Sequence, residues 1–304
     1  MDDTQRPHSA EQFGRQRDFW WRPDFLALLA RRLGNTEARS LLDVGTGRCH
    51  WAAIVTRWFP GLETLTGVDL EPAWVAGAPA ALAEHLGRPP FQAEFRQGSA
   101  LDLPFADATF DVVTCQTVLM HLADPARALG EMVRVAKPGG LVIASEPANF
   151  RAFVDMDSAM LALDLDGMVK RHRLWLACHL GRIALGRGDF NVGDRLLPLM
   201  RAAGLVDIDI VMNDKASPLA APYDDAMLAT NEQMDEVDAE LHGADRDATL
   251  ALAVAGGLAR DEAEALLGHE RECDRLRREQ FARGTFTSGG GSQHYVAWGR
   301  KAPA

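Results

Sequence analysis

Short apolar runs alternate with amphipathic stretches between about residues 40 and 147 of the chain. Apolar runs bounded by turn residues are typical of buried strands, and the amphipathic stretches between them have the spacing of helices that cover a sheet. Strands and helices that alternate in this way form βαβ units and a mainly parallel sheet. The predicted strands are SLLDV (40–44), LTGVDL (65–70), FQAEFRQG (91–98), FDVVTC (110–115) and LVIASE (141–146).

Helices are predicted between these strands and before the first one. WAAIVTRWF, EPAWVAGAPAALAEHLG and PARALGEMVRVA follow the first, second and fourth strands. Pro138-Gly139-Gly140 is expected to end the last of these helices and to turn the chain into the fifth strand. Segment 11–34, which contains FWW and DFLALLARRLG, is expected to form a helical element ahead of the sheet.

The pattern becomes mostly helical beyond Pro147. Residues 151–186 are rich in Leu, Ala and Met, and DRLLPLMRAAG (194–204) predicts a short helix. LVDIDIVM (205–212) and HYVAWGR (294–300) predict two more strands, with a helical block from about 222 to 283 between them.

Composition and charge restrict the classes of function. The 304 residues are 47% hydrophobic and 25% charged, ordinary values for a globular protein. The net charge of −11 is a poor match for a nucleic acid, whose binding depends on clustered cations. The four cysteines lack CxxC spacing, so neither a structural metal site nor a disulfide framework is expected. A polar N-terminus without a long apolar run indicates a cytoplasmic protein with no membrane partner.

The stretch LLDVGTGRCHWA, residues 41–52, joins the first predicted strand to the first predicted helix. Gly45 and Gly47 allow a ligand to approach the backbone closely. A dinucleotide loop would carry its third glycine at position 50, and the histidine there weighs against seating a diphosphate. Asp43 and Asp69 stand at the ends of the first two strands. Two carboxylates at these positions suit a cofactor that has both an amino acid group and a ribose. Asp43 would bind the amino acid group, and Asp69 would accept hydrogen bonds from the two ribose hydroxyls.

Five segments in order resemble the class I S-adenosylmethionine (SAM)-dependent methyltransferases. They are LLDVGTGRCHW, TGVDLEP, GSALDLPFADATFDVV, CQTVLMHLADP and EMVRVAKPGGLVIASEP, and weaker similarity continues through LLPLMRAAGLVDIDIV and HYVAWGRK. The resemblance implies an α/β fold with a Rossmann-like, seven-stranded, mostly parallel sheet and helices on both faces. It also implies a helical N-terminal element, a helical insertion before the sixth strand, where relatives insert substrate-binding helices, and the cofactor S-adenosyl-L-methionine. A second helical insertion is expected before the seventh strand, because about eighty residues stand where relatives usually have a short hairpin.

On this basis the chain is expected to consist of six segments. They are an N-terminal helical segment (1–37), a SAM-binding Rossmann-like core (38–150), a helical insertion on the substrate side (151–192), the completion of the core (193–212), a second helical insertion that is a lid or a dimer interface (213–291), and the last strand with its tail (292–304).

The resemblance also assigns the cofactor contacts. Ser99 stands where many relatives have an acid that binds the adenine amino group, so a weaker adenine contact is expected, supported by the N–H of Ala100 or Leu101. Cys49 replaces a common third glycine and is expected to be tolerated. The predicted cofactor-binding residues are Asp43, Gly45, Thr46, Gly47, Asp69, Leu70, Ser99, Ala100, Leu101, Gln116, Thr117 and Trp20. Alternatively, Asp43 only stabilises the turn, Asp69 only caps a helix, and Trp20 only packs in the core.

His121 is the predicted catalytic residue, because histidine is the side chain whose ordinary pKa suits proton abstraction near neutral pH. The alternative is a packing or capping role before the Asp-Pro turn. The predicted reaction is methyl transfer to an oxygen or nitrogen of a small-molecule acceptor. A protein methyltransferase, a non-catalytic SAM-binding partner subunit and a homodimer are left open, whereas nucleic acid and metal are not expected.

Overall fold

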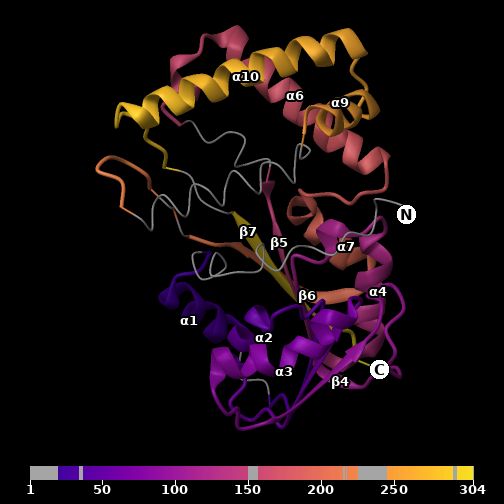
Figure 1. Cartoon of the computed structure of the whole chain (residues 1–304). Coiled ribbons are helices and arrows are strands. Elements are labelled where there is room, and N and C mark those ends of the chain that lie inside the picture. Colours follow the sequence, from indigo (N-terminus) through magenta and orange to yellow (C-terminus); the bar gives the residue numbers. More distant parts are fainter. Residues whose placement is uncertain are drawn as a thin grey trace. The chain divides into compact units, whose positions relative to one another are not determined.

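The computed structural model of the chain describes residues 20–33, 37–149, 157–214, 216, 218–224, 245–289 and 293–303. Two compact units are distinguished. The first consists of the described parts of Met1–Pro147, Asn191–Asp214 and His294–Ala304, and it contains the sheet. The second, from the described parts of Ala148–Phe190 and Lys215–Gln293, is mainly helical (Figure 1).

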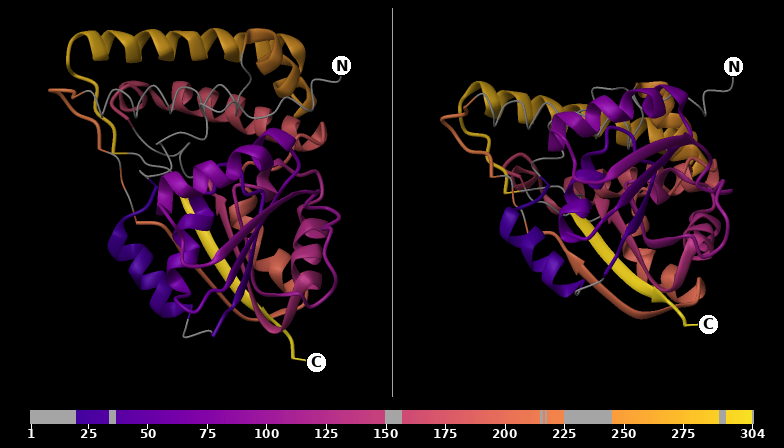
Figure 2. Two further views of the ribbon diagram at one scale, coloured as in Figure 1. Left: turned by 60° about the horizontal axis from the view of Figure 1, so that its bottom comes forward. Right: turned by 90° about the horizontal axis from the view of Figure 1, so that it is seen from below.

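The sheet has seven strands in the order β3-β2-β1-β4-β5-β7-β6. All neighbours are parallel except β7, which runs antiparallel to both β5 and β6 and is the yellow strand in Figure 2. The strand order reverses between β1 and β4, the position at which open α/β sheets bind ligands. The predicted Rossmann-like α/β fold is therefore confirmed. The strands are β1 (Ser40–Val44), β2 (Thr64–Asp69), β3 (Gln92–Gln97), β4 (Phe110–Gln116), β5 (Ala136–Pro147), β6 (Leu205–Met212) and β7 (His294–Lys301).

The predicted strand ends agree with the structure to within one residue, except at the start of β5. Helix α4 (Pro125–Val135) ends before the Pro-Gly-Gly sequence, and β5 begins directly at Ala136. The pairing with β4 then shifts, because Phe110 pairs with Ala136 but Val112 pairs with Leu141. Pro138-Gly139-Gly140 thus forms an irregularity inside the strand, which corrects the prediction that it separates helix from strand.

Helices cover both faces of the sheet. On one face, α1 (Pro23–Arg32), α2 (His50–Val55) and α3 (Pro72–Leu86) share a buried core with alternate strand residues. Alternation of side chains along a strand places these residues on the same side, and burying each large apolar one stabilises the fold by about 1.5–3 kcal/mol. The other face contacts α4 and α7 (Leu196–Ala202). The core of the first face includes Phe25, Leu29, Leu41, Trp51, Leu65, Val112, Leu141, Ile143, Val296 and Trp298.

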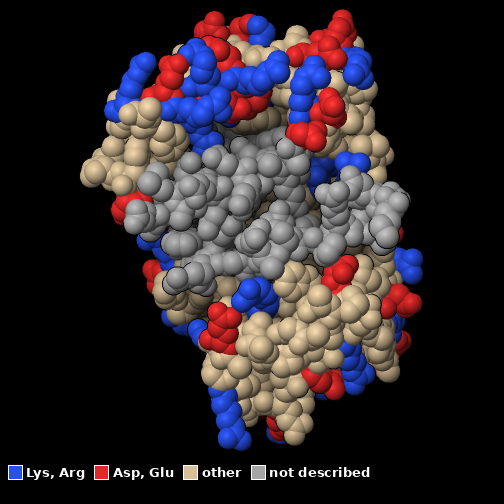
Figure 3. Space-filling model, viewed as in Figure 1, with Lys and Arg blue, Asp and Glu red and all other residues tan. Residues whose placement is uncertain are grey.

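The second unit is built on α6 (Leu165–Ala184), α9 (Arg246–Ala255) and α10 (Arg260–Ala282). One side of α10 buries Ala263, Leu266 and Leu267 against the other two helices. Its remaining surface has both signs of charge interspersed (Figure 3), and Arg275 pairs with Glu272 and Glu279 on it. Within the described ranges, no helix is long and apolar enough to cross a membrane. The short 3₁₀ turns of the chain are η4 (Thr56–Trp58), η5 (Leu119–His121), η6 (Met160–Ala162) and η7 (Val192–Arg195).

Candidate functional site

The loop after β1 turns tightly at Gly45. Its φ angle is +68°, and its N–H donates to the carbonyl of Val68 at 2.8 Å. A Cβ atom at this position would lie only 2.3 Å from Cγ2 of Val118, which follows β4. Glycine is therefore required both by the backbone angle and by the close approach of the β4 loop.

The carboxylate of Asp69 joins two elements of the site. Oδ2 accepts a hydrogen bond from the N–H of Gly47 at 2.9 Å, and Oδ1 accepts one from the N–H of Glu71 at 3.1 Å. A carboxylate has about four lone-pair positions. Two remain for the hydroxyls of a ribose, so organising the start of α3 is compatible with the predicted ribose contact.

Asp43 lies deeper, with only 1% of its surface exposed. Its Oδ2 accepts from the hydroxyl of Thr46 at 2.9 Å, and this bond stabilises the turn that Gly45 begins. The interpretation of Asp43 as a turn-stabilising residue thus has direct structural support. Its predicted contact with the amino acid end of the cofactor stays a prediction.

Cys49 occupies the position of the absent third glycine and takes a glycine-like φ of +58°. Its thiol is buried and lies 3.5 Å from the carbonyl oxygen of Ala78. Burial raises the pKa of this thiol to about 12, so it stays protonated and unreactive at neutral pH. The neighbouring His50 is also buried, with its ring edge-on to His85 at 5.9 Å.

The predicted adenine contacts lie beyond β2 and β3. Leu70 follows Asp69 and is 59% exposed, and its contact with the adenine ring stays a prediction. The hydroxyl of Ser99 accepts from the N–H of Leu101 at 3.1 Å, which occupies one of the two backbone donors expected for the ring. Ala100 is the remaining donor of the pair.

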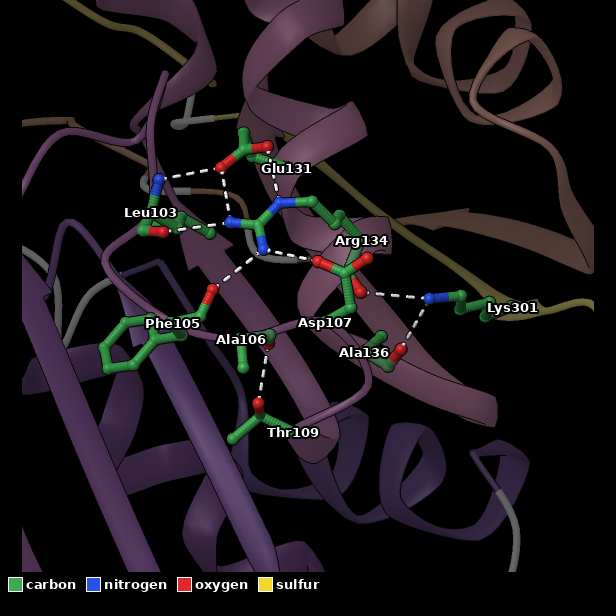
Figure 4. Close-up of polar contacts among 9 residues, drawn as sticks. All are labelled: Leu103, Phe105, Ala106, Asp107, Thr109, Glu131, Arg134, Ala136 and Lys301. Atoms are coloured by element: carbon green, nitrogen blue, oxygen red, sulfur yellow. Dashed lines mark hydrogen bonds and ion pairs between the residues drawn. The ribbon is translucent and has the colours of Figure 1, made fainter.

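Arg134 of α4 fixes the loop that follows these residues. Its guanidinium donates to the carbonyls of Leu103 and Phe105 and forms ion pairs with Glu131 and Asp107 (Figure 4). Glu131 also accepts from the N–H of Leu103 at 2.8 Å, and its hydrogen bonds with Arg134 hold the pKa of this carboxyl below its ordinary value. This clamp joins positions about 30 apart in the sequence, and no local motif indicated it.

Buried polar atoms without partners gather near the end of β4. Gln116 is 3% exposed, and neither its Oε1 nor its Nε2 has a hydrogen-bond partner in the described structure. The hydroxyl of its strand neighbour Ser145 is likewise buried without a partner in the described structure. Such groups cost about 1–3 kcal/mol each when they are left unsatisfied. A cofactor with a polar amino acid end fits this donor and acceptor set.

Thr117 continues the chain from Gln116 with a φ angle of +51°. This region is unfavourable for a β-branched residue, and such strain often marks a functional site. The N–H of Thr117 donates to the carbonyl of Ser145 at 2.9 Å, which holds the strained residue against β5.

The two remaining predicted residues lie in the same unit. His121 ends the turn η5 and is half-buried, and its N–H donates to the carbonyl of Val118 at 3.1 Å. Trp20 is half-buried and stacks on the ring of His294 at 4.3 Å. The catalytic role of His121 and the cofactor contact of Trp20 stay predictions.

One buried carboxylate, Glu146, was not identified from the sequence. It is fully buried at the end of β5, and its oxygens accept three backbone hydrogen bonds from residues 118–120. The available signal was an acid that follows the apolar residues 141–144 and Ser145 at the end of the LVIASE run, just before a proline. In the described part of the chain, no group of three or more His, Cys, Asp or Glu side chains is arranged to hold a metal.

Comparison with known proteins gives one family and several relatives. The profile of the family described as "Methyltransferase domain" matches residues 42–144. The demethylmenaquinone methyltransferase of Halalkalibacterium halodurans is 33% identical over 134 residues, or 44% of this chain and 52% of the relative. That of Desulfitobacterium hafniense is 38% identical over 134 residues, or 43% of this chain and 50% of the relative. The chain thus spans about half the length of these curated relatives.

Two solved structures share the fold. The YcgJ protein of Bacillus subtilis superposes with a TM-score of 0.52 at 17% identity, covering 93% of this chain and 100% of that one. A protein of Bacillus halodurans C-125, provisionally assigned as a methyltransferase, gives a TM-score of 0.51 at 17% identity, with coverages of 92% and 99%. At this level of identity, the likeness shows the fold.

Proposed function

We propose that this protein transfers the methyl group of SAM to an oxygen or nitrogen of a small-molecule acceptor, because the profile described as "Methyltransferase domain" matches residues 42–144 and the sheet has the Rossmann-like order. SAM supplies an activated methyl group on a sulfonium centre. The protein then has to hold the acceptor in line with that group, and orientation of this kind lowers barriers by roughly 7–11 kcal/mol in favourable cases.

The observation that carries the proposal is the chemistry assembled at the β1–β4 switch point. Asp69 offers acceptor capacity beside the glycine loop, and Gln116 at the end of β4 offers a buried amide that has no partner among the described residues. In the proposal, Asp69 binds the ribose and Gln116 binds the amino acid end of SAM. Trp20 and Thr117 complete that end, and Leu70 packs on the adenine ring.

A small-molecule acceptor is supported by two observations. The two curated relatives from Halalkalibacterium halodurans and Desulfitobacterium hafniense are named as demethylmenaquinone methyltransferases, and demethylmenaquinone is a small molecule. The net charge of −11 also disfavours a nucleic acid, because phosphate backbones are bound by cationic surfaces.

His121 is the proposed general base. Its loop follows the strand that ends in Gln116, and an imidazole accepts a proton near neutral pH. The test compares pH–rate profiles of the wild type with those of His121→Ala and His121→Gln. We expect both variants to lose roughly 10²–10⁴-fold in rate together with the acidic limb of the profile. A variant that keeps the rate and the profile would make His121 structural.

The proposed function is tested in two steps. Calorimetry should detect binding of SAM and S-adenosylhomocysteine but not of NAD. Incubation with methyl-labelled SAM and a metabolite extract should then give a methylated small molecule by mass spectrometry, with Asp69→Ala as the matched inactive control. Label found only in protein would favour a protein methyltransferase. SAM binding with no labelled product in either fraction would favour a non-catalytic partner subunit.

A further inference from the structure

Four consecutive backbone N–H groups after β4 are held by the end of β5. The N–H of Thr117 donates to the carbonyl of Ser145, and those of Val118 and Leu119 each donate to Oε1 of Glu146 at 2.9 Å. The N–H of Met120 donates to Oε2 of Glu146 at 3.2 Å. One fully buried carboxylate therefore fixes three residues of the loop.

The same loop carries side chains that reach the proposed cofactor site. Gln116 and Thr117 precede the three anchored residues, and Val118 packs against the glycine loop at the position where Gly45 has no Cβ. A shift of Val118 would therefore move both the loop after β4 and the turn after β1. The strained φ of Thr117 also requires support from its surroundings, because such an angle persists only where neighbouring contacts hold it.

We propose that Glu146 is a positioning residue whose carboxylate holds residues 118–120 in the conformation that binds SAM. This inference rests on the proposed SAM-binding function. It adds a residue that contacts no part of the cofactor in the proposal and acts through the backbone of Val118, Leu119 and Met120.

Burial raises the pKa of the Glu146 carboxyl to about 7, against the opposing effect of the three N–H donors. The ionised form holds the three donors more strongly, because hydrogen bonds to a charged acceptor are roughly twice as strong as neutral ones and the protonated oxygen is a weaker acceptor. The thiol of Cys115, 3.8 Å away, stays protonated in this range because burial raises its pKa well above the ordinary value. The elements that contact β5 carry the following titratable and charged side chains: Asp111 and Cys115 (β4), His121 (η5), Asp194 and Arg195 (η7), Arg127, Glu131 and Arg134 (α4), and His294, Tyr295, Arg300 and Lys301 (β7).

The expected result is a SAM affinity that depends on pH. Because a carboxyl with a pKa near 7 is mostly neutral at pH 6 and mostly ionised at pH 8, binding should weaken by about tenfold between pH 8 and pH 6. Glu146→Gln should remove this dependence, since an amide does not titrate. At pH 8 the variant should also bind more weakly than the wild type, because its NH₂ group faces one of the three N–H donors.

The experiment measures SAM binding by calorimetry at pH 6, 7 and 8, and amide hydrogen exchange of residues 117–121 without ligand. The matched control is Asp111→Asn, which alters a carboxylate that accepts from the N–H groups of Arg39 and Ser40 at the amino ends of β1 and β4, whereas Glu146 lies at the carboxyl end of β5. Titration of SAM itself affects all three proteins equally. We expect exchange at Met120 to be at least about tenfold faster in Glu146→Gln and unchanged in the control.

Failure of this inference and failure of the proposed function give different results. If the wild type does not bind SAM, the proposed function is wrong, while the exchange data still report whether Glu146 orders the loop. If the wild type binds SAM and Glu146→Gln matches it in affinity, pH dependence and exchange, Glu146 is not a positioning residue. Glu146→Leu is less informative because it removes every acceptor and can prevent folding.

Discussion

The carboxylate of Asp69, the last residue of β2, accepts a hydrogen bond of 2.9 Å from the backbone N–H of Gly47, which lies in the loop after β1. The bond joins the end of β2 to the glycine loop after β1, and the second oxygen holds the N–H of Glu71 at the start of α3. One side chain thus orders the loops that surround the proposed ribose and still has acceptor capacity for the two hydroxyls.

Asp69→Asn should therefore weaken SAM binding without unfolding the chain. The amide keeps the size of the side chain but replaces one acceptor oxygen with a donor. Loss of a hydrogen bond to a charged group costs about 1.5–3 kcal/mol, which corresponds to an affinity roughly 10- to 150-fold lower. Calorimetry with SAM measures this loss. Glu63→Gln, an exposed acid just before the same strand, is the control and should bind like the wild type. Equal affinities for Asp69→Asn and the wild type would leave Asp69 with its turn-organising role alone.

The strands could be predicted because the information that defines them is local. Apolar runs such as SLLDV and FDVVTC are buried, and Gly45 stands where a positive φ angle is needed. The start of β5 was predicted wrongly because Pro138-Gly139-Gly140 was interpreted as a break between elements. In the structure these three residues lie inside β5, where the pairing with β4 shifts. Their conformation therefore depends on pairing between strands and not on the local sequence alone.

The polar contacts that order the site could not be predicted in the same way. Arg134 reaches the carbonyl of Leu103, and Glu146 reaches the N–H of Val118, across 31 and 28 positions of sequence. Both contacts depend on tertiary packing that brings loops to strand ends. Sequence alone also left two roles open for Asp69, and the structure shows that its carboxylate can serve the start of α3 while keeping room for a ligand.

Gln116→Leu should separate stability from binding. The two polar atoms of Gln116 are buried without partners in the described structure, so an apolar side chain of similar size removes an unfavourable term. We expect thermal unfolding at an equal or higher temperature in the absence of SAM, together with SAM binding weakened at least about tenfold. Differential scanning calorimetry with and without SAM measures both effects. A lower melting temperature with unchanged SAM affinity would show that Gln116 serves only the core.

Arg134→Gln should destabilise the chain in a pH-dependent way. Hydrogen bonds from Arg134 lower the pKa of Glu131, so their stabilising effect is present above the ordinary carboxyl pKa and is lost as the pH falls through the lowered value. At pH 7 we expect a free energy of unfolding about 1–3 kcal/mol lower than that of the wild type, and a smaller difference below pH 4. Urea denaturation at both pH values measures this. Arg39→Gln breaks an exposed pair with Glu63 and should change stability by less than about 1 kcal/mol. If the difference in free energy of unfolding between Arg134→Gln and the wild type were as large below pH 4 as at pH 7, the ion pair with Glu131 would not be its cause.

Replacing Cys49 measures how much stability the chain loses by having a residue with a side chain at a position whose backbone angle favours glycine. At an ordinary helical position, glycine is less stable than alanine by roughly 0.5–1 kcal/mol. At a φ of +58° the order should invert, because the left-handed region costs a residue with a Cβ about 1–2 kcal/mol. Both Cys49→Gly and Cys49→Ala lose the buried thiol, so comparing them isolates the backbone term. We expect the glycine variant to unfold at higher urea concentration than the alanine variant. As a control, Ala52→Gly inside α2 should be less stable than the wild type, as is usual for glycine in a helix. If Cys49→Ala proved as stable as Cys49→Gly, the positive φ angle at position 49 would carry no measurable cost for a residue with a Cβ. The absence of a glycine there would then have no effect on stability.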